Sequence, residues 1–268
     1  MPGDFGRMCK MGEIRMDTVE TRRNAVEKLI NEKGSVSFAQ LKEAFPQVSE
    51  MTLRTDLKVL DEERRILRIH GGARSVQVLI DTDDFLSRKA VRNIPEKQLI
   101  AKKALKLLRP DTTVFLDSGS TATVFARRFP DQSNLIYTTG LSCAAELAAL
   151  SRPAVMIPGG RLNRYSQSVF GFPAIREVEQ VNFHQAFLGV AGYQNPAGFT
   201  CGVYEEAMLK RTAARQADQV IVLMDASKAG IKSTFHICDL KEVDVVISDG
   251  KLPEDFLREC ETYQVEVL

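Results

Sequence analysis

Residues 48–60 decide how the N-terminal part of the chain folds, and they read Val-Ser-Glu-Met-Thr-Leu-Arg-Thr-Asp-Leu-Lys-Val-Leu. Ser49 is a residue type that caps helices, and three leucines follow it on one face of a helix: Leu53, Leu57 and Leu60. If this apolar face turns inward, helical geometry points the polar side chains of the segment outward. The stretch therefore predicts an amphipathic helix with an exposed polar face.

The segments on either side complete a small domain. Residues 18–33 have apolar side chains at helical spacing, and Ser37 is placed to cap a second, shorter helix. After the helix at 49–60 come a β-like stretch at 66–70 and a tight Gly-Gly turn. Three helices that are joined by tight turns and followed by a small strand hairpin are typical of a winged helix-turn-helix.

The polar face of the helix at 49–60 has the side chains that a DNA-reading helix needs. Arg54 can donate two hydrogen bonds to a guanine edge, and Ser49 or Thr55 can contact a phosphate or a thymine methyl. Lys58 and the arginines that follow the helix are placed for phosphates. We expect DNA contacts from Ser49, Glu50, Met51, Thr52, Arg54, Thr55, Lys58, Arg65, Arg68 and His70. For this helix taken alone, an ordinary solvated surface helix is the alternative.

Shifts in composition divide the chain into four parts. Residues 1–16 have no apolar periodicity, and we expect a disordered leader there. Residues 17–73 form the expected DNA-binding domain. Acidic residues gather in the following segment, so we place a linker at 74–90 and a second domain at 91–268.

Helices and short apolar strands alternate in the second domain. We expect strands at 113–116, 135–138, 154–157, 185–190, 219–225 and 243–248, with helices between them. These strands lack polar alternation, which indicates a parallel sheet that is covered on both faces. The predicted fold class is therefore α/β: an N-terminal winged helix-turn-helix followed by a parallel-sheet domain.

Polar residues gather where these strands end. The strand at 113–116 runs into Asp117-Ser-Gly-Ser-Thr121 and then a helix, so backbone N–H groups are exposed at a site that suits one phosphate. Taken alone, this loop can equally be a tight turn. Ligands of parallel sheets bind at the carboxyl ends of the strands. We therefore expect effector contacts from Asp117, Ser118, Gly119, Ser120, Thr121, Thr138, Thr139, Gly159, Gly160, Arg161, Asp225 and Lys228.

Two further pairs of residues are candidates for a site. Glu206 and Lys210 are four residues apart on a predicted helix, where they form an exposed ion pair or Lys210 turns inward to a ligand. His184 and His236 have no cysteine or acidic partner at ligand spacing. We expect no metal, and no cofactor motif is recognisable.

Two ordered sets of motifs resemble the DeoR family of bacterial transcription regulators. The run from Ser49 to Leu57, together with Arg68-Ile-His-Gly-Gly-Ala73, is similar to the N-terminal signature of that family. The family more often has a second arginine at the position of Thr55. The resemblance covers about residues 17–250. It implies a winged helix-turn-helix followed by a sensor domain that is related in fold to ribose-5-phosphate isomerase.

The same resemblance implies roles in the second domain. In the family, the Asp-x-Gly-Ser-Thr loop, a Gly-Gly turn, a Glu…Lys helix and an Asp-x-Ser-Lys turn line a pocket for phosphorylated sugars or related metabolites. The family commonly has an asparagine where this chain has Thr139. The matching residues are Asp117, Gly119, Ser120, Thr121, Gly159, Gly160, Glu206, Lys210, Asp225 and Lys228.

Composition excludes several classes of protein. The chain has 36 lysines and arginines and 35 aspartates and glutamates, and the net charge of +1 excludes a uniformly basic nucleic-acid coat. The apolar runs are too short to span a membrane, and no secretory signal is visible. Five scattered cysteines fit reduced thiols, so we expect a cytoplasmic protein.

These features predict a DNA-binding transcription regulator, a repressor of a carbohydrate-metabolism operon that is controlled by a phosphorylated sugar or related metabolite. Its expected partners are double-stranded operator DNA, the effector and further copies of the chain in a dimer or tetramer. The linker and the helix at 99–108 are expected to couple the two domains. The alternative is a phosphosugar aldose–ketose isomerase with Glu206 or Asp117 as the base. A weaker third hypothesis is an architectural DNA-binding protein whose second domain binds no ligand.

Overall fold

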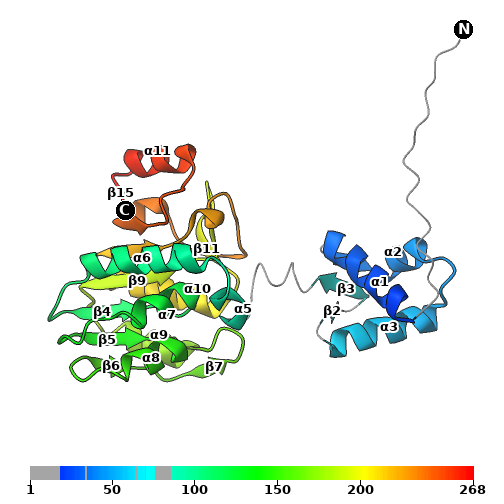
Figure 1. The fold of residues 1–268 in the computed structure, drawn as a ribbon, viewed down its shortest axis with the longest axis horizontal. Coiled ribbons are helices and arrows are strands. Elements are labelled where there is room, and N and C mark those ends of the chain that lie inside the picture. Colours follow the sequence, from blue (N-terminus) through cyan, green and yellow to red (C-terminus); the bar gives the residue numbers. More distant parts are fainter. Residues whose placement is uncertain (1–18, 34, 64, 70, 76–85) are drawn as a thin grey trace, which may run out of the picture. The chain divides into compact units, whose positions relative to one another are not determined.

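The computed structural model describes residues 19–33, 35–63, 65–69, 71–75 and 86–268 (Figure 1). The chain divides into two compact units, and the division falls between residues 79 and 80, inside the predicted linker. The predicted leader lies outside the described residues, as do His70 and most of the predicted linker.

The first unit is a winged helix-turn-helix, as predicted. Its elements are α1 (Val19–Lys33), β1 (Ser35–Ser37), α2 (Phe38–Ala44), α3 (Glu50–Glu62), β2 (Ile66–Ile69) and β3 (Gly72–Ser75). The strands form an antiparallel sheet in the order β1-β3-β2. The sequence patterns indicated all of these elements except β1, which is only three residues long.

Local sequence explains where the helices of this unit begin. The Ser37 hydroxyl accepts a hydrogen bond from the backbone N–H of Gln40, whose side chain accepts one from the Ser37 N–H. Ser49 caps α3 by accepting from the N–H of Thr52. At Gly72, an added Cβ would lie 2.3 Å from the carbonyl oxygen of Val36, so β3 approaches β1 more closely than any side chain allows.

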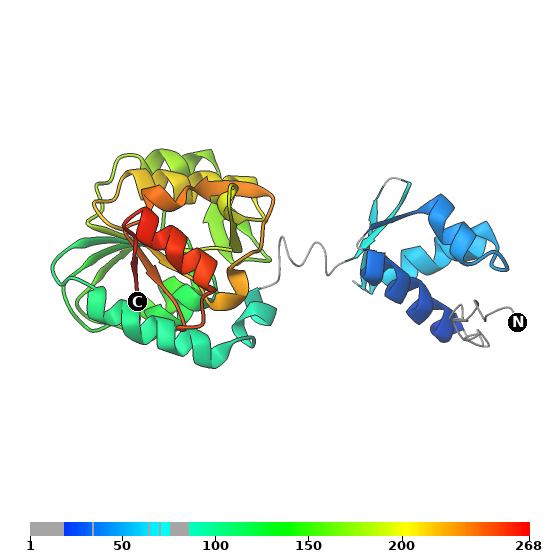
Figure 2. The same ribbon diagram turned by 90° about the horizontal axis from the view of Figure 1, so that it is seen from above.

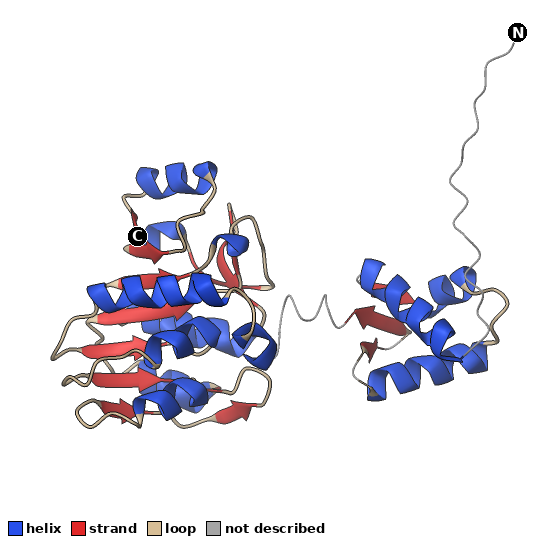
Figure 3. Ribbon diagram, viewed as in Figure 1, coloured by secondary structure: helices blue, strands red, loops and turns tan. Residues whose placement is uncertain are grey.

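The second unit is an α/β domain (Figure 3). Its helices are α5 (Leu86–Ala90), α6 (Ile94–Leu107), α7 (Ser120–Ala126), α8 (Leu141–Leu147), α9 (Phe172–Val178), α10 (Tyr204–Arg215) and α11 (Glu254–Thr262). Its strands are β4 (Thr113–Leu116), β5 (Leu135–Thr138), β6 (Ala154–Met156), β7 (Arg161–Asn163), β8 (Ser168–Phe170), β9 (Gln185–Gly189), β10 (Gly192–Gln194), β11 (Gly198–Cys201), β12 (Val220–Leu223), β13 (Phe235–Cys238), β14 (Val245–Ile247) and β15 (Glu266–Val267).

Seven parallel strands form the central sheet in the order β15-β14-β12-β9-β4-β5-β6. Successive residues of a strand serve different cores: Phe115 packs with α9 and α10, whereas Val114 and Leu116 pack with α6, α7 and α8. Figure 2 shows the helices on the two sides of this sheet. Both faces are thus covered, which explains why these strands lack polar alternation.

The order of the strands positions the site. Strands β12, β9 and β4 are neighbours in the middle of the sheet, so their carboxyl ends lie together. Strands β5 and β6 follow on the far side of β4, away from β9 and β12. The antiparallel sheet β10-β11-β13 and the hairpin β7-β8 are additions that the sequence patterns did not indicate.

Candidate DNA-contacting face and effector cavity

The helix α3 presents most of its predicted DNA contacts on one exposed face. Ser49, Glu50, Arg54, Thr55 and Lys58 are exposed, and Thr52 is half-buried. The side chain of Met51 is 75% exposed, which is unusual for a large apolar residue. The buried residues of α3 face the core of the first unit. The expected division into an inner and an outer face is therefore present.

Several side chains of this face are already oriented. The guanidinium of Arg54 lies 4.2 Å from the centre of the Phe38 ring on α2, a cation–π contact that leaves its hydrogen-bond donors available. The Thr55 hydroxyl donates to the Met51 carbonyl oxygen at 2.9 Å. The Lys58 ammonium lies 3.7 Å from the Glu62 carboxylate, and both side chains are mostly exposed. An exposed ion pair of this kind is weak, so Lys58 can exchange Glu62 for a DNA phosphate at little cost in free energy.

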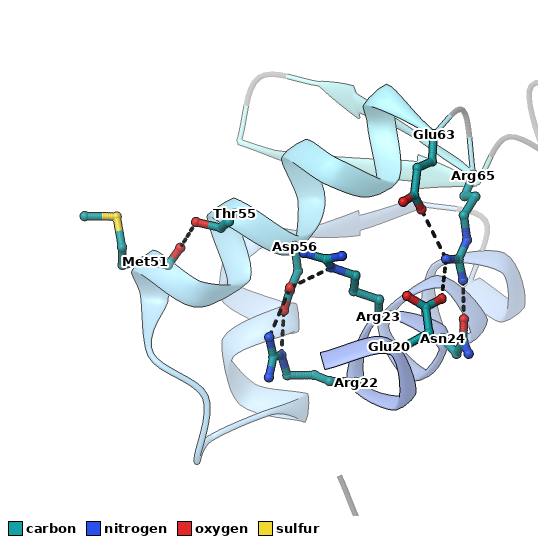
Figure 4. A network of polar contacts seen from close by, with 9 residues as sticks. All are labelled: Glu20, Arg22, Arg23, Asn24, Met51, Thr55, Asp56, Glu63 and Arg65. Carbon is teal, nitrogen blue, oxygen red and sulfur yellow. Dashed lines mark hydrogen bonds and ion pairs between the residues drawn. The ribbon is translucent and has the colours of Figure 1, made fainter. Parts of the chain in front are cut away.

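The predicted phosphate contacts after α3 differ from one another. Arg65 donates hydrogen bonds to Glu20 and Glu63 (Figure 4) and also to Glu27. Burial lowers the pKa of Arg65 less than these carboxylates raise it. Its donors are therefore engaged by neighbouring carboxylates, which gives no support to a phosphate contact. Arg68 is exposed on β2. Arg68 thus stays a candidate for a phosphate, and His70 lies outside the described residues.

A buried carboxylate on α3 was not predicted. Asp56 is 1% exposed, and its Oδ2 accepts a hydrogen bond from Arg22 Nε at 2.6 Å (Figure 4). Its Oδ1 accepts from Arg22 Nη2 and from Arg23 Nε, each at 3.1 Å. The sequence does contain the signal, because Asp56 lies on the same helical stripe as the inward leucines. An acidic residue on such a stripe requires a cation beside it.

A cavity of about 330 Å³ opens at the carboxyl ends of β4, β9 and β12. Its size is at the lower end of the range for small-molecule sites. It is lined by Leu86, Lys89, Arg92, Asn93, Lys97, Ser118, Gly119, Ser120, Thr121, Ala122, Ser166, Gly189, Val190, Ala191, Cys201, Gly202, Glu206, Lys210, Leu223, Asp225, Ser227, Lys228 and Ile231. Eight of the predicted effector residues are among them: Ser118, Gly119, Ser120, Thr121, Glu206, Lys210, Asp225 and Lys228.

Positive charge dominates this lining. Five cations line the cavity, Lys89, Arg92, Lys97, Lys210 and Lys228, against the two carboxylates Glu206 and Asp225. One of the carboxylates is held by neighbours, because Asp225 Oδ1 accepts from Asn93 Nδ2 at 3.2 Å and from the N–H of Ser227 at 3.1 Å. The cavity is thus suited to an anionic ligand.

An ion pair lies at the base of the cavity. The Lys210 ammonium is 2.7 Å from Asp117 Oδ2 and 2.7 Å from the Gly189 carbonyl oxygen, and Gly189 N–H donates to the same carboxylate at 2.8 Å. Burial raises the pKa of Asp117, and Lys210 opposes that rise. Burial lowers the pKa of Lys210, but the surrounding acidic groups raise it above its ordinary value. Lys210 therefore turns inward, and the exposed ion pair with Glu206 is not formed.

The Glu206 carboxylate is fixed by a different partner. Its Oε1 accepts a hydrogen bond from the Ser168 hydroxyl at 3.1 Å, and that hydroxyl is 2.7 Å from the Ser166 hydroxyl. Ser166 itself lines the cavity. The predicted Glu…Lys helix thus contributes an acceptor and a cation to the same cavity, each held by its own neighbours.

The turn between α5 and α6 forms a wall that the sequence patterns did not indicate. Lys97 is buried, and its ammonium donates to the carbonyl oxygens of Lys89 and Arg92. Burial lowers the pKa of Lys97, more than the Asp225 carboxylate raises it. Asn93 has a left-handed backbone conformation (φ 50°) that turns its side chain toward Asp225. In the sequence these charges are indistinguishable from those of a solvated helix.

Six predicted effector residues are not among the lining residues. One of them is Asp117, which contacts the lining residue Lys210, and the other five have different partners. Thr138, the last residue of β5, and Thr139 after it are buried, and the Thr138 hydroxyl accepts from the Gly140 N–H. A Cβ on Gly160 would lie 2.5 Å from the Phe170 carbonyl oxygen, so this glycine serves the close approach of two chain segments. The Gly159 N–H donates to Glu177, and Arg161 pairs with Glu205 at 3.2 Å. An effector contact at these five positions has no support in this geometry.

The described part of the chain contains no cluster of three or more His, Cys, Asp or Glu residues that could hold a metal ion. Its four cysteines, Cys143, Cys201, Cys238 and Cys260, are buried free thiols. Burial raises the pKa of Cys201, which lines the cavity, to about 11.

None of the described helices combines the length and apolar character that a membrane span requires.

Two family models match the chain. The model of the DeoR-like helix-turn-helix domain matches residues 22–78, and the model of the DeoR C terminal sensor domain matches residues 92–250. Each match lies within one of the two compact units, and together they include α3 and the residues after strands β4, β9 and β12.

Curated relatives align over nearly the whole chain. The HTH-type transcriptional regulator YulB of Bacillus subtilis is 30% identical over 93% of this chain and 96% of its own length. The glycerol-3-phosphate regulon repressor of Escherichia coli K12 is 28% identical over 92% of this chain and 97% of its own. Among solved structures, ribose 5-phosphate isomerase A of Methanocaldococcus jannaschii is 18% identical, with a TM-score of 0.37 over 50% of this chain and 53% of that chain.

Proposed function

The chain belongs to the DeoR family of helix-turn-helix transcription regulators, and from this premise we propose that it represses a carbohydrate-metabolism operon under the control of a phosphorylated sugar or related metabolite. The family and the winged helix-turn-helix imply DNA binding, and the sensor domain implies a small-molecule effector. The glycerol-3-phosphate regulon repressor and the lactose phosphotransferase system repressor of Staphylococcus epidermidis are relatives of this chain. The names of these two relatives support the proposal that this chain also represses genes of carbohydrate metabolism.

The cationic lining of the cavity carries the proposal of a phosphorylated effector. A phosphate brings about two negative charges, and a buried anion without compensation costs several kcal/mol. Lys97 and Lys228 are placed to offset this charge, and the N–H groups of Gly119–Thr121 add hydrogen-bond donors. Glu206 also lines the cavity, and its carboxylate can accept hydrogen bonds from the hydroxyl groups of a sugar.

The turn between α5 and α6 supports a route for control. It lines the cavity, and α5 is the first described element after the DNA-binding unit. An anion beside Lys97 competes with the Lys89 and Arg92 carbonyl oxygens for its ammonium, so effector binding changes how the end of α5 is held. The effector controls DNA affinity only if it favours one operator-binding arrangement, and a tenfold change needs about 1.4 kcal/mol of coupling.

An isomerase activity is not expected. The matched families are those of transcription regulators, and one candidate base, Asp117, is held in an ion pair with Lys210. The wild-type chain is therefore expected to interconvert no aldose and ketose phosphates. Turnover in a coupled assay that Glu206→Gln removes would contradict this expectation.

A screen by thermal shift identifies the effector class. Pentose, hexose and triose phosphates are compared with the corresponding free sugars. A ligand at 100 times its dissociation constant is expected to add about 2.7 kcal/mol to the free energy of unfolding. Only the phosphorylated compounds are expected to raise the melting temperature.

Replacement of Lys228 by alanine is expected to weaken the effector response about tenfold, because one charged hydrogen bond to the phosphate is lost. Lys228 is half-buried at the cavity and has no ion-pair partner among the described residues, so its removal leaves no carboxylate stranded. The measurement is the concentration of the best phosphorylated sugar of the screen that gives half-maximal release of DNA. Lys232→Ala is the control, since Lys232 is exposed and does not line the cavity. Equal responses of the two variants would contradict a role for Lys228.

The chain is expected to be a dimer or a tetramer. One winged unit buries too little surface for the affinity of a typical repressor, and two-fold symmetric proteins match palindromic half-sites. Light scattering at micromolar concentration is expected to give two or four times the chain mass of 29.9 kDa. A mass of one chain, with and without DNA, would contradict this expectation.

A further inference from the structure

Asp56 on α3 forms an ion cluster with Arg22 and Arg23 on α1. Burying these charges costs desolvation free energy that an apolar contact between the two helices would not. Asp56 occupies a buried position between the inward leucines Leu53 and Leu57 of α3. Replacing buried ion pairs by apolar side chains often leaves stability unchanged or improves it. Stability alone therefore does not explain a carboxylate at this position.

Geometry distinguishes this cluster from an apolar contact. Arg22 binds Asp56 with two donors, Nε to Oδ2 at 2.6 Å and Nη2 to Oδ1 at 3.1 Å, and Arg23 adds Nε to Oδ1 at 3.1 Å. A two-donor contact of a planar guanidinium with a carboxylate fixes both distance and direction. Apolar side chains that pack together tolerate small rotations and shifts, and this contact does not.

The cluster lies directly beside the side chains that we expect to contact DNA. Asp56 follows Thr55 on α3 (Figure 4). Arg54 lies one residue further back and is exposed. Both arginines belong to α1, so the cluster sets the rotation of α3 about its own axis relative to α1. Recognition groups must be held within about 0.5 Å of their working position.

We propose that Asp56, with Arg22 and Arg23, is a positioning site that sets the sequence specificity of DNA binding without touching a base. This inference rests on the proposed function, because it requires that α3 reads DNA. The cluster holds α3 at the angle at which Arg54 reaches a base edge. When the cluster is lost, α3 still carries its positive charges, but it no longer presents them in one fixed register.

The change of charge in Asp56→Asn allows loss of positioning to be distinguished from simple destabilisation of the fold. Asp56→Asn removes one negative charge, and electrostatics alone then favours binding to any duplex. Loss of positioning lowers only the affinity for the preferred sequence. The proposal therefore expects the two affinities to separate, with weaker specific binding and unchanged or stronger non-specific binding.

The experiment uses the full chain and two DNA probes. One is a duplex that the wild-type chain selects from a random-sequence library, and the other is a random duplex of the same length. Fluorescence anisotropy at one salt concentration gives the ratio of the two affinities. Asp56→Asn is expected to lower this ratio about tenfold, since one base contact becomes misplaced.

Two further variants serve as controls. Glu62→Gln makes the same change of charge on the same helix at a mostly exposed residue, and its ratio is expected to equal that of the wild type. Arg22→Lys keeps the charge and loses the two-donor geometry, so it is expected to lower the ratio as Asp56→Asn does. Thermal unfolding of each variant shows whether it is folded at the temperature of the titration.

Equal ratios for Asp56→Asn and Glu62→Gln would overturn the proposal, as would an equal loss of both affinities in Asp56→Asn. If Asp56→Asn is not folded, Arg22→Lys decides, because it keeps a cation beside the carboxylate, and an unchanged ratio then overturns the proposal. A wild-type chain that selects no sequence would instead contradict the proposed function.

Discussion

Lys210→Met is expected to abolish the response to the phosphorylated effector and to lower the free energy of unfolding of the second unit by about 3–5 kcal/mol. Both effects follow from the position of the ammonium, which lines the cavity and lies 2.7 Å from the buried Asp117 carboxylate. The substitution removes a cation from the effector site, and it also leaves a buried charge without a partner. Chemical denaturation measures the second effect.

The double variant Asp117→Asn/Lys210→Met separates the two effects. It removes the stranded charge, so it is expected to recover most of the lost stability. It is expected to bind the selected duplex as the wild type does, with no effector response, because the cavity still lacks the Lys210 cation. Stability without a response assigns the Asp117–Lys210 pair to the effector site. A normal response in the double variant would contradict its role in the cavity.

Arg54→Ala is expected to weaken specific DNA binding by about 1–3 kcal/mol and to relax the preference at one position of the operator. Arg54 is exposed on α3, and its guanidinium is already directed by the Phe38 ring. A guanine contact forms only where the duplex has a guanine at the right position. The affinity for random DNA is therefore expected to fall much less than the affinity for the selected duplex. Titrations of the selected and the random duplex at several salt concentrations measure both affinities.

Lys58→Ala is the matched control for Arg54→Ala. Lys58 is one helical turn further along the same face, and its exposed pair with Glu62 does not hold it firmly. Loss of a phosphate contact is expected to weaken binding to all sequences alike and to flatten the dependence on salt. An equal loss on specific and random DNA for Arg54→Ala would show that Arg54 does not read a base.

Sequence patterns predicted the regular part of the fold well. Strands β4 and β5 have the predicted bounds, because each is a continuous apolar run between turn residues. Helix α3 was predicted from one cap and three leucines. Strands β10 and β11 were not, because they are short, contain glycine and do not alternate between polar and apolar residues.

The order of the strands explains which of the predicted site residues lie away from the cavity. The sequence shows that Asp117, Thr139 and Gly160 all follow a strand, but it does not show which strands are neighbours. The cavity forms where β12, β9 and β4 meet, and the ends of β5 and β6 lie beyond it. Residues after β4 and β12 therefore line the cavity, whereas Thr139 and Gly160 do not.

The partners of buried charges were the second feature that the patterns did not reveal. Asp56 and Lys210 stand at inward positions of amphipathic helices, yet each has a partner that is distant in the sequence. Lys97 is likewise buried against the preceding turn. Helical periodicity shows that such a residue faces inward, but only the fold shows which group neutralises it.

Titration of DNA in the presence of sugar phosphates tests the central claim most directly. The wild-type chain binds its selected duplex, and the dissociation constant is measured with each phosphorylated sugar of the screen and with the same sugar without phosphate. At least one phosphorylated sugar is expected to change the dissociation constant tenfold or more, about 1.4 kcal/mol of coupling, while its free sugar changes nothing. A chain that prefers no sequence, or whose affinity no phosphorylated sugar alters, would contradict the account.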